Sequence, residues 1–131
     1  MNLSKSKKSA FQYYVTGDLK QAERLCKEIL RKQPHDADIL QLLGILYYQL
    51  QQFDSAIHYL KKALQYNPTN PDAYYNLGRA FQKKGKINDA IKNYQKALQY
   101  NPYSIDAYLN FGNLLQEHII ILELRFRKKV N

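Results

Sequence analysis

The sequence has few of the residues on which many other classes of domain depend. Among its 131 residues there are one cysteine, no tryptophan, five glycines and four prolines. The single cysteine, Cys26, excludes an internal disulfide or a multi-cysteine zinc site, and together with the missing secretory leader it predicts a reducing, cytoplasmic location. The longest apolar run, residues 119–122, is far below the roughly 20 residues that a membrane span needs, so no such span is expected. Low glycine and proline content favours long helices in one domain.

Residues that could form a catalytic or metal centre are scarce and scattered. The three histidines, His35, His58 and His118, share no spacing that would bring them to one metal ion. No glycine-rich phosphate loop occurs. Cys26 falls at a helical core position, which favours a buried thiol over a nucleophile. The sequence therefore predicts a protein that is not an enzyme and needs no cofactor.

Basic residues outnumber acidic ones, and the excess lies toward the two ends. Residues 1–36 hold eight basic and four acidic residues, residues 37–117 eight and six, and residues 118–131 four and one, which gives the net charge of +9. A nucleic-acid-binding surface usually shows a continuous basic stripe with exposed aromatic residues. The sequence shows no such stripe, so a protein or peptide is the expected partner and nucleic acid is the weaker alternative.

A 34-residue period runs through most of the chain. At this shift three sets of small or rigid residues coincide: Gly44, Gly78 and Gly112; Ala22, Ala56 and Ala90; Pro34, Pro68 and Pro102. Within each period the large apolar residues follow helical spacing in two stretches, so each unit is predicted to be a pair of amphipathic helices. One hairpin cannot cover its own apolar faces, so neighbouring units must stack. The predicted fold class is an all-α array of antiparallel helix pairs.

Polar residues at the same period mark where the first helix of each unit begins. Asn2, Asp36, Asn70 and Ser104 each carry a side chain that can accept a hydrogen bond from a first-turn N–H group. Proline cannot continue a helix, so the three periodic prolines each follow the end of a second helix. First helices are predicted near residues 3–15, 37–50, 71–84 and from 105 onward. The units are residues 3–36, 37–70 and 71–104 with a partial fourth from 105, in one domain spanning 1–131.

The complete pattern resembles the tetratricopeptide repeat family. In one unit it is carried by Leu40, Leu43, Gly44, Tyr47, Ala56, Leu60, Ala63 and Pro68, and in the next by Tyr74, Leu77, Gly78, Phe81, Ala90, Tyr94, Ala97 and Pro102. The resemblance implies a right-handed superhelix whose first helices line a concave groove that holds an extended peptide. The Asn-Pro spacing also resembles the repeat regions of O-linked N-acetylglucosamine transferases and of bacterial scaffold proteins. This implies a further alternative, the substrate-selecting part of a larger glycosyltransferase.

The resemblance assigns a set of side chains to the groove. They are Gln41, Leu42, Ile45 and Tyr48, then Tyr75, Asn76, Arg79 and Lys83, then Leu109, Asn110 and Asn113. Asn76 and Asn110 form a two-step amide ladder suited to a peptide backbone, with the alternative that both amides serve neighbouring helices. Arg79 and Lys83 lie one turn apart and suit an acidic side chain or a C-terminal carboxylate.

The carboxylate clamp with which some members of the family hold chaperone tails is not expected here. That clamp uses lysine, asparagine and arginine at five places. In this sequence Lys7 fits, whereas Phe11, Leu42, Asp72 and Asn76 stand at the other four places.

The repeat fails after Glu117. Ile119 stands where Gly17 and Gly85 make the turn between paired helices. The turn is predicted to be lost, so that the divergent residues 118–131 continue the preceding helix, with an apolar stripe formed by Leu115, Ile119, Leu122 and Phe126. Three alternatives remain for this segment: it folds back as a cap, it binds a second copy of the chain to make a homo-oligomeric scaffold, or it is a truncated end that packs poorly.

Overall fold

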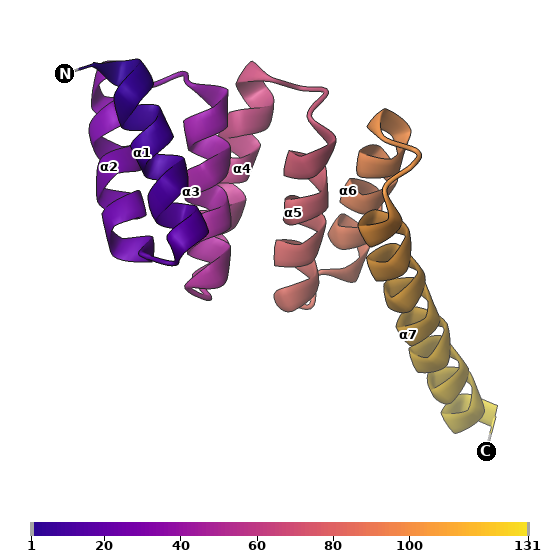
Figure 1. Ribbon diagram of the computed structural model, residues 1–131. Helices are drawn as coiled ribbons and strands as arrows, with labels where there is room; N and C mark the ends of the chain where they lie inside the picture. The colour runs from indigo at the N-terminus through magenta and orange to yellow at the C-terminus, as the bar shows by residue number, and fades with distance from the viewer. Residues whose placement is uncertain (1, 131) are drawn as a thin grey trace.

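The computed structural model describes residues 2–130, and all of their regular structure is helical. The seven helices are α1 (Leu3–Thr16), α2 (Leu19–Lys32), α3 (Ala37–Gln49), α4 (Phe53–Tyr66), α5 (Pro71–Lys83), α6 (Ile87–Tyr100) and α7 (Ile105–Val130). The first six form three hairpins side by side, and α7 follows without a partner (Figure 1). The predicted all-α array of antiparallel helix pairs is confirmed.

Each first helix begins where the period predicted, because the predicted cap is in place. Four side chains accept a hydrogen bond from a backbone N–H: Asn2 from Lys5 (3.2 Å), Asp36 from Ile39 (3.1 Å), Asn70 from Asp72 (3.0 Å) and Ser104 from Ala107 (3.2 Å). Such a cap contributes about 1 kcal/mol to the stability of its helix. The helix starts are therefore encoded locally.

The turn between paired helices requires a left-handed backbone conformation. The φ angle is 86° at Gly17 and 75° at Gly85, and it is 60° at Gln51, which holds the same place in the second unit. This conformation is open to glycine, strained for an unbranched side chain and strongly unfavourable for a β-branched one. Ile119 holds the place in the fourth unit, and there the chain stays helical as far as Val130. The predicted loss of the turn is confirmed, and we attribute it to this β-branched side chain.

The first helices form one continuous row and the second helices do not. Along the row α1 contacts α3, α3 contacts α5 and α5 contacts α7, whereas within residues 2–130 the second helices α2, α4 and α6 make no contact with one another. The second helices are therefore splayed on the outer side of the array, and the first helices form its inner side.

Two glycines of the repeat signature lie where paired helices touch, and the third has lost its partner. A Cβ atom added at Gly44 would lie 2.6 Å from the Cγ of Leu60, and one at Gly78 would lie 2.8 Å from the ring of Tyr94. At Gly112 a Cβ would meet nothing within 4 Å. The difference follows from the missing turn, because within residues 2–130 no second helix returns to cover α7.

Helix α7 leaves the array partway along its length (Figure 1). Ala107 and Leu114 are buried, whereas every residue from 119 to 130 is exposed. The alternative that this segment folds back as a cap is wrong, because the straight helix carries it away from α6. None of the helices within residues 2–130 combines the length and the apolar character that crossing a bilayer requires.

Candidate functional site

A hollow of about 480 Å³, which we call the central hollow, opens on the inner side of the array. It is lined by Tyr48 of α3, Arg79, Gln82 and Lys83 of α5, Tyr94 of α6, and Asn110 and Glu117 of α7. Four of the side chains predicted for the groove thus surround one space. A smaller hollow of about 350 Å³, lined in part by Tyr48 and Lys83, is next to it.

Arg79 is held between two tyrosine rings beside the central hollow. The carbon of its guanidinium group lies 4.4 Å from the ring centroid of Tyr48 and 5.5 Å from that of Tyr75. An aromatic face attracts a cation by about 0.5–1 kcal/mol at an exposed site. Within residues 2–130 no carboxylate lies within ion-pair distance of Arg79. The rings therefore position a guanidinium whose hydrogen-bond donors remain free to bind an anion.

The two amides of the predicted ladder each make one hydrogen bond inside the array. The Nδ2 of Asn76 donates to the backbone carbonyl of Asp72 in its own helix (2.9 Å). The Nδ2 of Asn110 donates to the hydroxyl of Tyr75 on the neighbouring first helix. A structural role thus accounts for one N–H of each amide. The second N–H and the side-chain oxygen of each have no partner within residues 2–130, so both half-buried amides can still donate and accept.

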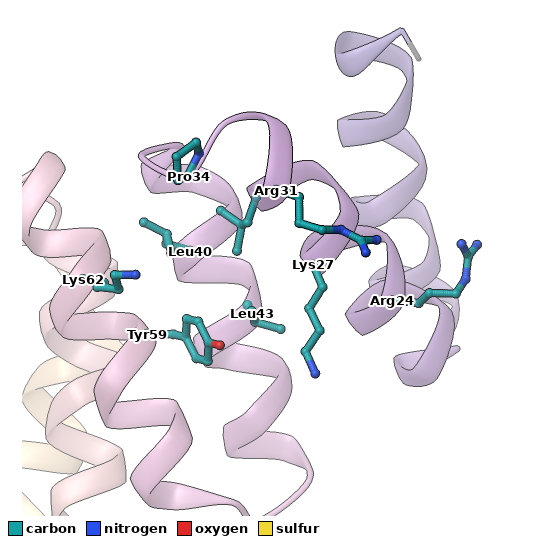
Figure 2. Close-up of a pocket in the computed structure, with 9 residues that line it drawn as sticks. Arg24, Lys27, Arg31, Pro34, Leu40, Leu43, Tyr59 and Lys62 are labelled. Carbon is teal, nitrogen blue, oxygen red and sulfur yellow. The ribbon is translucent and has the colours of Figure 1, made fainter.

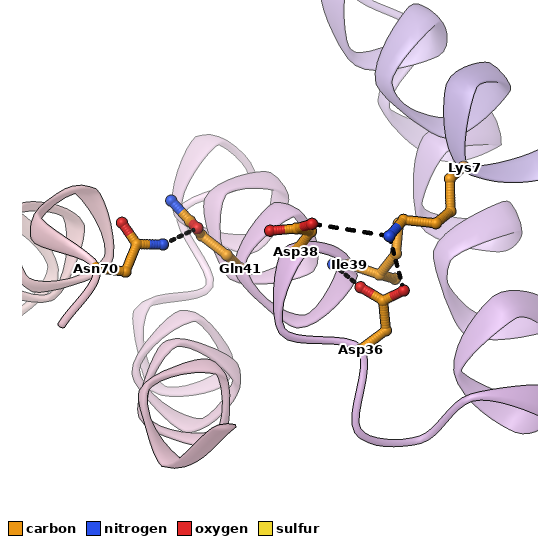
Figure 3. A network of polar contacts seen from close by, with 6 residues as sticks. All are labelled: Lys7, Asp36, Asp38, Ile39, Gln41 and Asn70. Carbon is orange, nitrogen blue, oxygen red and sulfur yellow. Dashed lines mark hydrogen bonds and ion pairs between the residues drawn. The ribbon is translucent and has the colours of Figure 1, made fainter. Parts of the chain in front are cut away.

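Polar side chains at the N-terminal end of the inner side already have partners (Figure 3). Gln41 accepts a hydrogen bond from the amide of Asn70. The ammonium of Lys7 lies 2.9 Å from a carboxylate oxygen of Asp36 and 3.7 Å from one of Asp38, and its hydrogen bond to Asp36 raises the pKa of Lys7. These contacts join α1 to α3 and α3 to the start of α5. This end therefore has fewer polar side chains free to bind a ligand than the central hollow has.

Leu42 does not line the groove, and the prediction for this residue is wrong. Its side chain is 2% exposed and belongs to the buried cluster that includes Ala10 of α1 and Ala80 of α5. A leucine in the row of first helices gains stability by burial, whereas the asparagines at the same place in the next two units stay half-buried. Ile45 is half-buried too, so the groove has less apolar surface at this end than the sequence suggested.

The remaining predicted groove residues are exposed, and three further residues, Gln82, Tyr94 and Glu117, line the central hollow. Lys83, Leu109 and Asn113 are open to solvent. Sequence reasoning missed Glu117, which the period could have found because it lies 34 residues after Lys83. It also treated Tyr94 as core only. The ring is indeed buried, and burial raises the pKa of its hydroxyl, but Tyr94 also lines the hollow, and its hydroxyl donates to Gln82 (2.8 Å).

The residues predicted for self-association lie along one side of α7. Leu115 is half-buried, and the exposed fractions are 54% for Ile119, 48% for Leu122 and 68% for Phe126. Exposed Ile105 and Tyr108 continue this stripe toward the start of the helix at spacings of three and four residues. We call these six residues together with Gly112 the α7 stripe.

Comparison with models of known protein families shows which family the chain belongs to. Models described as "Tetratricopeptide repeat" match residues 16–59 and 71–104, and one described as "TPR repeat" matches residues 44–85. The chain belongs to the tetratricopeptide repeat family. As a tetratricopeptide repeat array it is a protein-interaction module, and the predicted family is confirmed.

Solved structures with the same repeat superpose on most of the chain. The first repeat domain of Spaghetti (RPAP3) bound to an HSP90 peptide gives a TM-score of 0.85 at 20% identity, over 89% of this chain and 93% of that one. MamA gives 0.77 at 29% identity, over 83% and 64%. The Thermobaculum terrenum O-GlcNAc transferase gives 0.81 at 24% identity, over 88% and 23%. The first and third of these likenesses show the shared fold and nothing finer.

A curated relative shares a shorter segment. The probable UDP-N-acetylglucosamine–peptide N-acetylglucosaminyltransferase SEC of Arabidopsis thaliana is 42% identical over 48 residues. This segment covers 37% of the present chain and 5% of the relative. The chain therefore matches a small part of the length of that enzyme.

Proposed function

We propose that this tetratricopeptide repeat array binds an extended segment of another protein along its inner side, without catalysing a reaction. The segment lies across the central hollow, where an acidic side chain or a C-terminal carboxylate pairs with Arg79. The amides of Asn76 and Asn110 hold the peptide backbone beside it. Lys83 adds positive charge, and Glu117 restricts how many negative charges the segment can carry there.

The observation that carries this proposal is the arrangement around Arg79. Two rings fix the guanidinium, no acid of residues 2–130 neutralises it, and it borders a hollow of about 480 Å³. A hydrogen bond to a charged group contributes about 1.5–3 kcal/mol to binding. A positioned arginine without an ion-pair partner, on the same inner side as two amides that each keep one free N–H and a free oxygen, is therefore a strong anchor for a peptide.

The test begins by capturing partners on the intact chain and identifying them by mass spectrometry. The bound segment is then made as a dye-labelled peptide and titrated by fluorescence anisotropy. We expect Arg79→Gln to weaken binding about tenfold or more, because it removes a charged hydrogen-bond donor. The double variant Asn76→Ala with Asn110→Ala should weaken binding to a similar extent.

The matched control is Lys92→Gln, which removes an exposed positive charge from the second helix α6. It should leave the affinity unchanged. If Lys92→Gln weakens binding as much as Arg79→Gln does, bulk charge is responsible and the inner-side site is wrong. Unchanged affinity in the Arg79 and double amide variants would also contradict the proposal.

A second candidate function is self-assembly through the α7 stripe. Six large apolar side chains lie on one side of this helix, and at Gly112 the surface is flat enough for another helix to come close. In a parallel pair the basic last turns, with Arg127, Lys128 and Lys129, would repel each other. We therefore propose an antiparallel, twofold-symmetric pair of α7 helices.

Sedimentation equilibrium tests this candidate. The intact chain should sediment as a dimer, and Ile119→Asp with Leu122→Asp should sediment as a monomer, because charges in the interface lose their hydration. The control, Ile120→Asp with Leu124→Asp, changes equally exposed apolar residues that lie off the stripe and should remain a dimer. A monomeric intact chain, or equal dissociation of both variants, would disprove the stripe as an interface.

A further inference from the structure

The outer side of the array carries a second hollow that the proposed function does not use. This outer hollow, of about 540 Å³, lies between the second helices α2 and α4, which make no contact with each other. Figure 2 shows Lys27 and Arg31 on one side, Tyr59 and Lys62 on the other, and leucines between them. Its size is within the range of about 300–1,000 Å³ that is usual for ligand sites.

One difference between the repeats helps to leave room here. Leu40 lies at the floor of the outer hollow, and Tyr74 holds the same place in the next unit. The ring of Tyr74 stacks on Tyr100 with centroids 5.7 Å apart, and its hydroxyl donates to the carbonyl of Pro68 (2.8 Å). A tyrosine there takes up space beside the second helices, whereas the shorter leucine leaves it open.

The rim of the outer hollow is strongly basic. Arg24, Lys27 and Arg31 come from one side of α2, and Lys62 comes from α4. Arg24 pairs with Glu28 (3.1 Å) and Lys27 with Glu23 (3.0 Å). Within residues 2–130, Arg31 and Lys62 form no ion pair. Two uncompensated cations thus flank an apolar floor.

This basic rim is specific to the first two units. One period later its four places are held by His58, Lys61, Gln65 and Lys96, so two of the four full positive charges are absent. The open floor and the higher charge occur at the same interface. Together they favour a ligand that is both apolar and acidic.

We propose that the outer hollow binds an acidic segment of a partner protein, independently of the inner side. A large apolar side chain of the segment packs against the half-buried Leu30 and the ring of Tyr59, above the buried Leu40 and Leu43. An adjacent aspartate or glutamate pairs with Arg31 and Lys62. The guanidinium of Arg31 can hold a carboxylate through two parallel hydrogen bonds, and the hydroxyl of Tyr59 can donate a third. The array would then hold two chain segments at once, one on each side.

The shape and chemistry of the floor favour a peptide over other anionic partners. Nucleic acid binding uses aromatic side chains on which bases stack, whereas the floor of this hollow is aliphatic. Within residues 2–130, Tyr59 at its side is the one aromatic residue that lines it. A membrane surface would need apolar side chains that project outward, whereas Leu40 and Leu43 are buried at the bottom of the hollow. A side chain that inserts from a flexible segment suits this geometry.

The experiment is an NMR titration of the isotope-labelled intact chain with a short capped peptide of alternating aspartate and leucine. We expect saturable shifts at backbone amides of α2 and α4 around the hollow. A peptide with serine in place of leucine, and one with lysine in place of aspartate, should bind at least about tenfold more weakly. Equal binding of the serine peptide would mean that charge alone acts, and would overturn the proposal.

Two variants test the site itself. Leu40→Tyr introduces the tyrosine that the next unit has at this position, and it should fill the hollow. The double variant Arg31→Gln with Lys62→Gln removes the two cations that form no ion pair within residues 2–130. Both residues are exposed or half-buried, so the fold should be preserved. Each variant should weaken binding of the aspartate–leucine peptide about tenfold or more, whereas Arg79→Gln should not. The outer site would be disproved if no saturable shifts appear at α2 and α4, or if either variant keeps its affinity for the peptide. It would also be disproved if a short DNA strand binds more tightly than the peptide, or if Arg79→Gln loses binding of the peptide. Arg79→Gln, which tests the inner site, keeps the two proposals distinguishable.

Discussion

The second and fourth units carry the same repeat signature, yet its residues are better covered in the second unit than in the fourth. Leu40 is 1% exposed, whereas Tyr108, two periods later, is 53% exposed. Gly44 lies against Leu60 of α4, whereas Gly112 faces open space. The first helices of both units begin with the same kind of cap. The comparison teaches that the signature specifies a surface for packing, and that the surface becomes core only when a second helix returns to cover it.

Thiol reactivity should show the largest difference between a fully packed unit, here the first, and the fourth unit. Cys26 is fully buried, and burial together with the nearby carboxylates of Asp36 and Glu23 raises its pKa to about 12. In Gly112→Cys the new thiol would be exposed, with an ordinary pKa of about 8.5. At neutral pH and low protein concentration we expect a disulfide reagent to modify the new thiol more than about a thousandfold faster than Cys26. Comparable rates in the folded variant would show that the N-terminal core opens readily.

Two leucines of α7 should mark where the packed part of the array ends. Leu114 is buried against the preceding hairpin, and Leu122 lies beyond the point where α7 leaves it. Leu114→Ala should lower the free energy of unfolding by about 2–5 kcal/mol, and Leu122→Ala should change it by less than about 0.5 kcal/mol. Urea denaturation of the dilute chain measures both. A large loss in Leu122→Ala would mean that the exposed end of α7 is covered in solution.

Replacing Gly44 and Gly112 with alanine should change the free energy of unfolding in opposite directions. In Gly44→Ala the new methyl group meets Leu60, so we expect a loss of about 1–3 kcal/mol in the free energy of unfolding. In Gly112→Ala nothing is in the way, and the higher helix propensity of alanine should add up to about 1 kcal/mol. Thermal unfolding of the two variants gives the signs. Destabilisation by both would mean that Gly112 is in contact with another helix.

Much of the fold was predictable because it depends on local residues. Asp36 and Ser104 cap their helices through contacts within the first turn, which do not depend on tertiary packing. Ile119 likewise disfavours the turn through its own backbone preference. The direction in which α7 then runs could not be predicted, because it depends on how Leu114 packs against α5 and α6.

The candidate site was predictable in outline only. The resemblance to the repeat family assigned Arg79 and Asn110 to the inner side, and both line the central hollow. It could not show that Tyr48 and Tyr75 enclose Arg79, because these rings come from different units at places that the period does not relate. It also could not show that Leu42 is buried and Asn76 half-buried. The two residues hold equivalent backbone positions in successive units, and their burial depends on the side chain. The outer hollow depends in the same way on how much space Leu40 leaves beside neighbouring helices.

The isoleucine in the turn position also governs how such an array can grow. Repeat proteins lengthen when a unit is duplicated in tandem, and a new unit must receive a packing surface on each side. A copy of residues 71–104 inserted before Ile105 would find both surfaces, and its own glycine turn, already in place. A copy added after Val130 would be held away from the existing stack by a straight helix. Ile119 therefore ends the stacking of repeats on this side. Replacing it with glycine would be the first step in extending the array at this end.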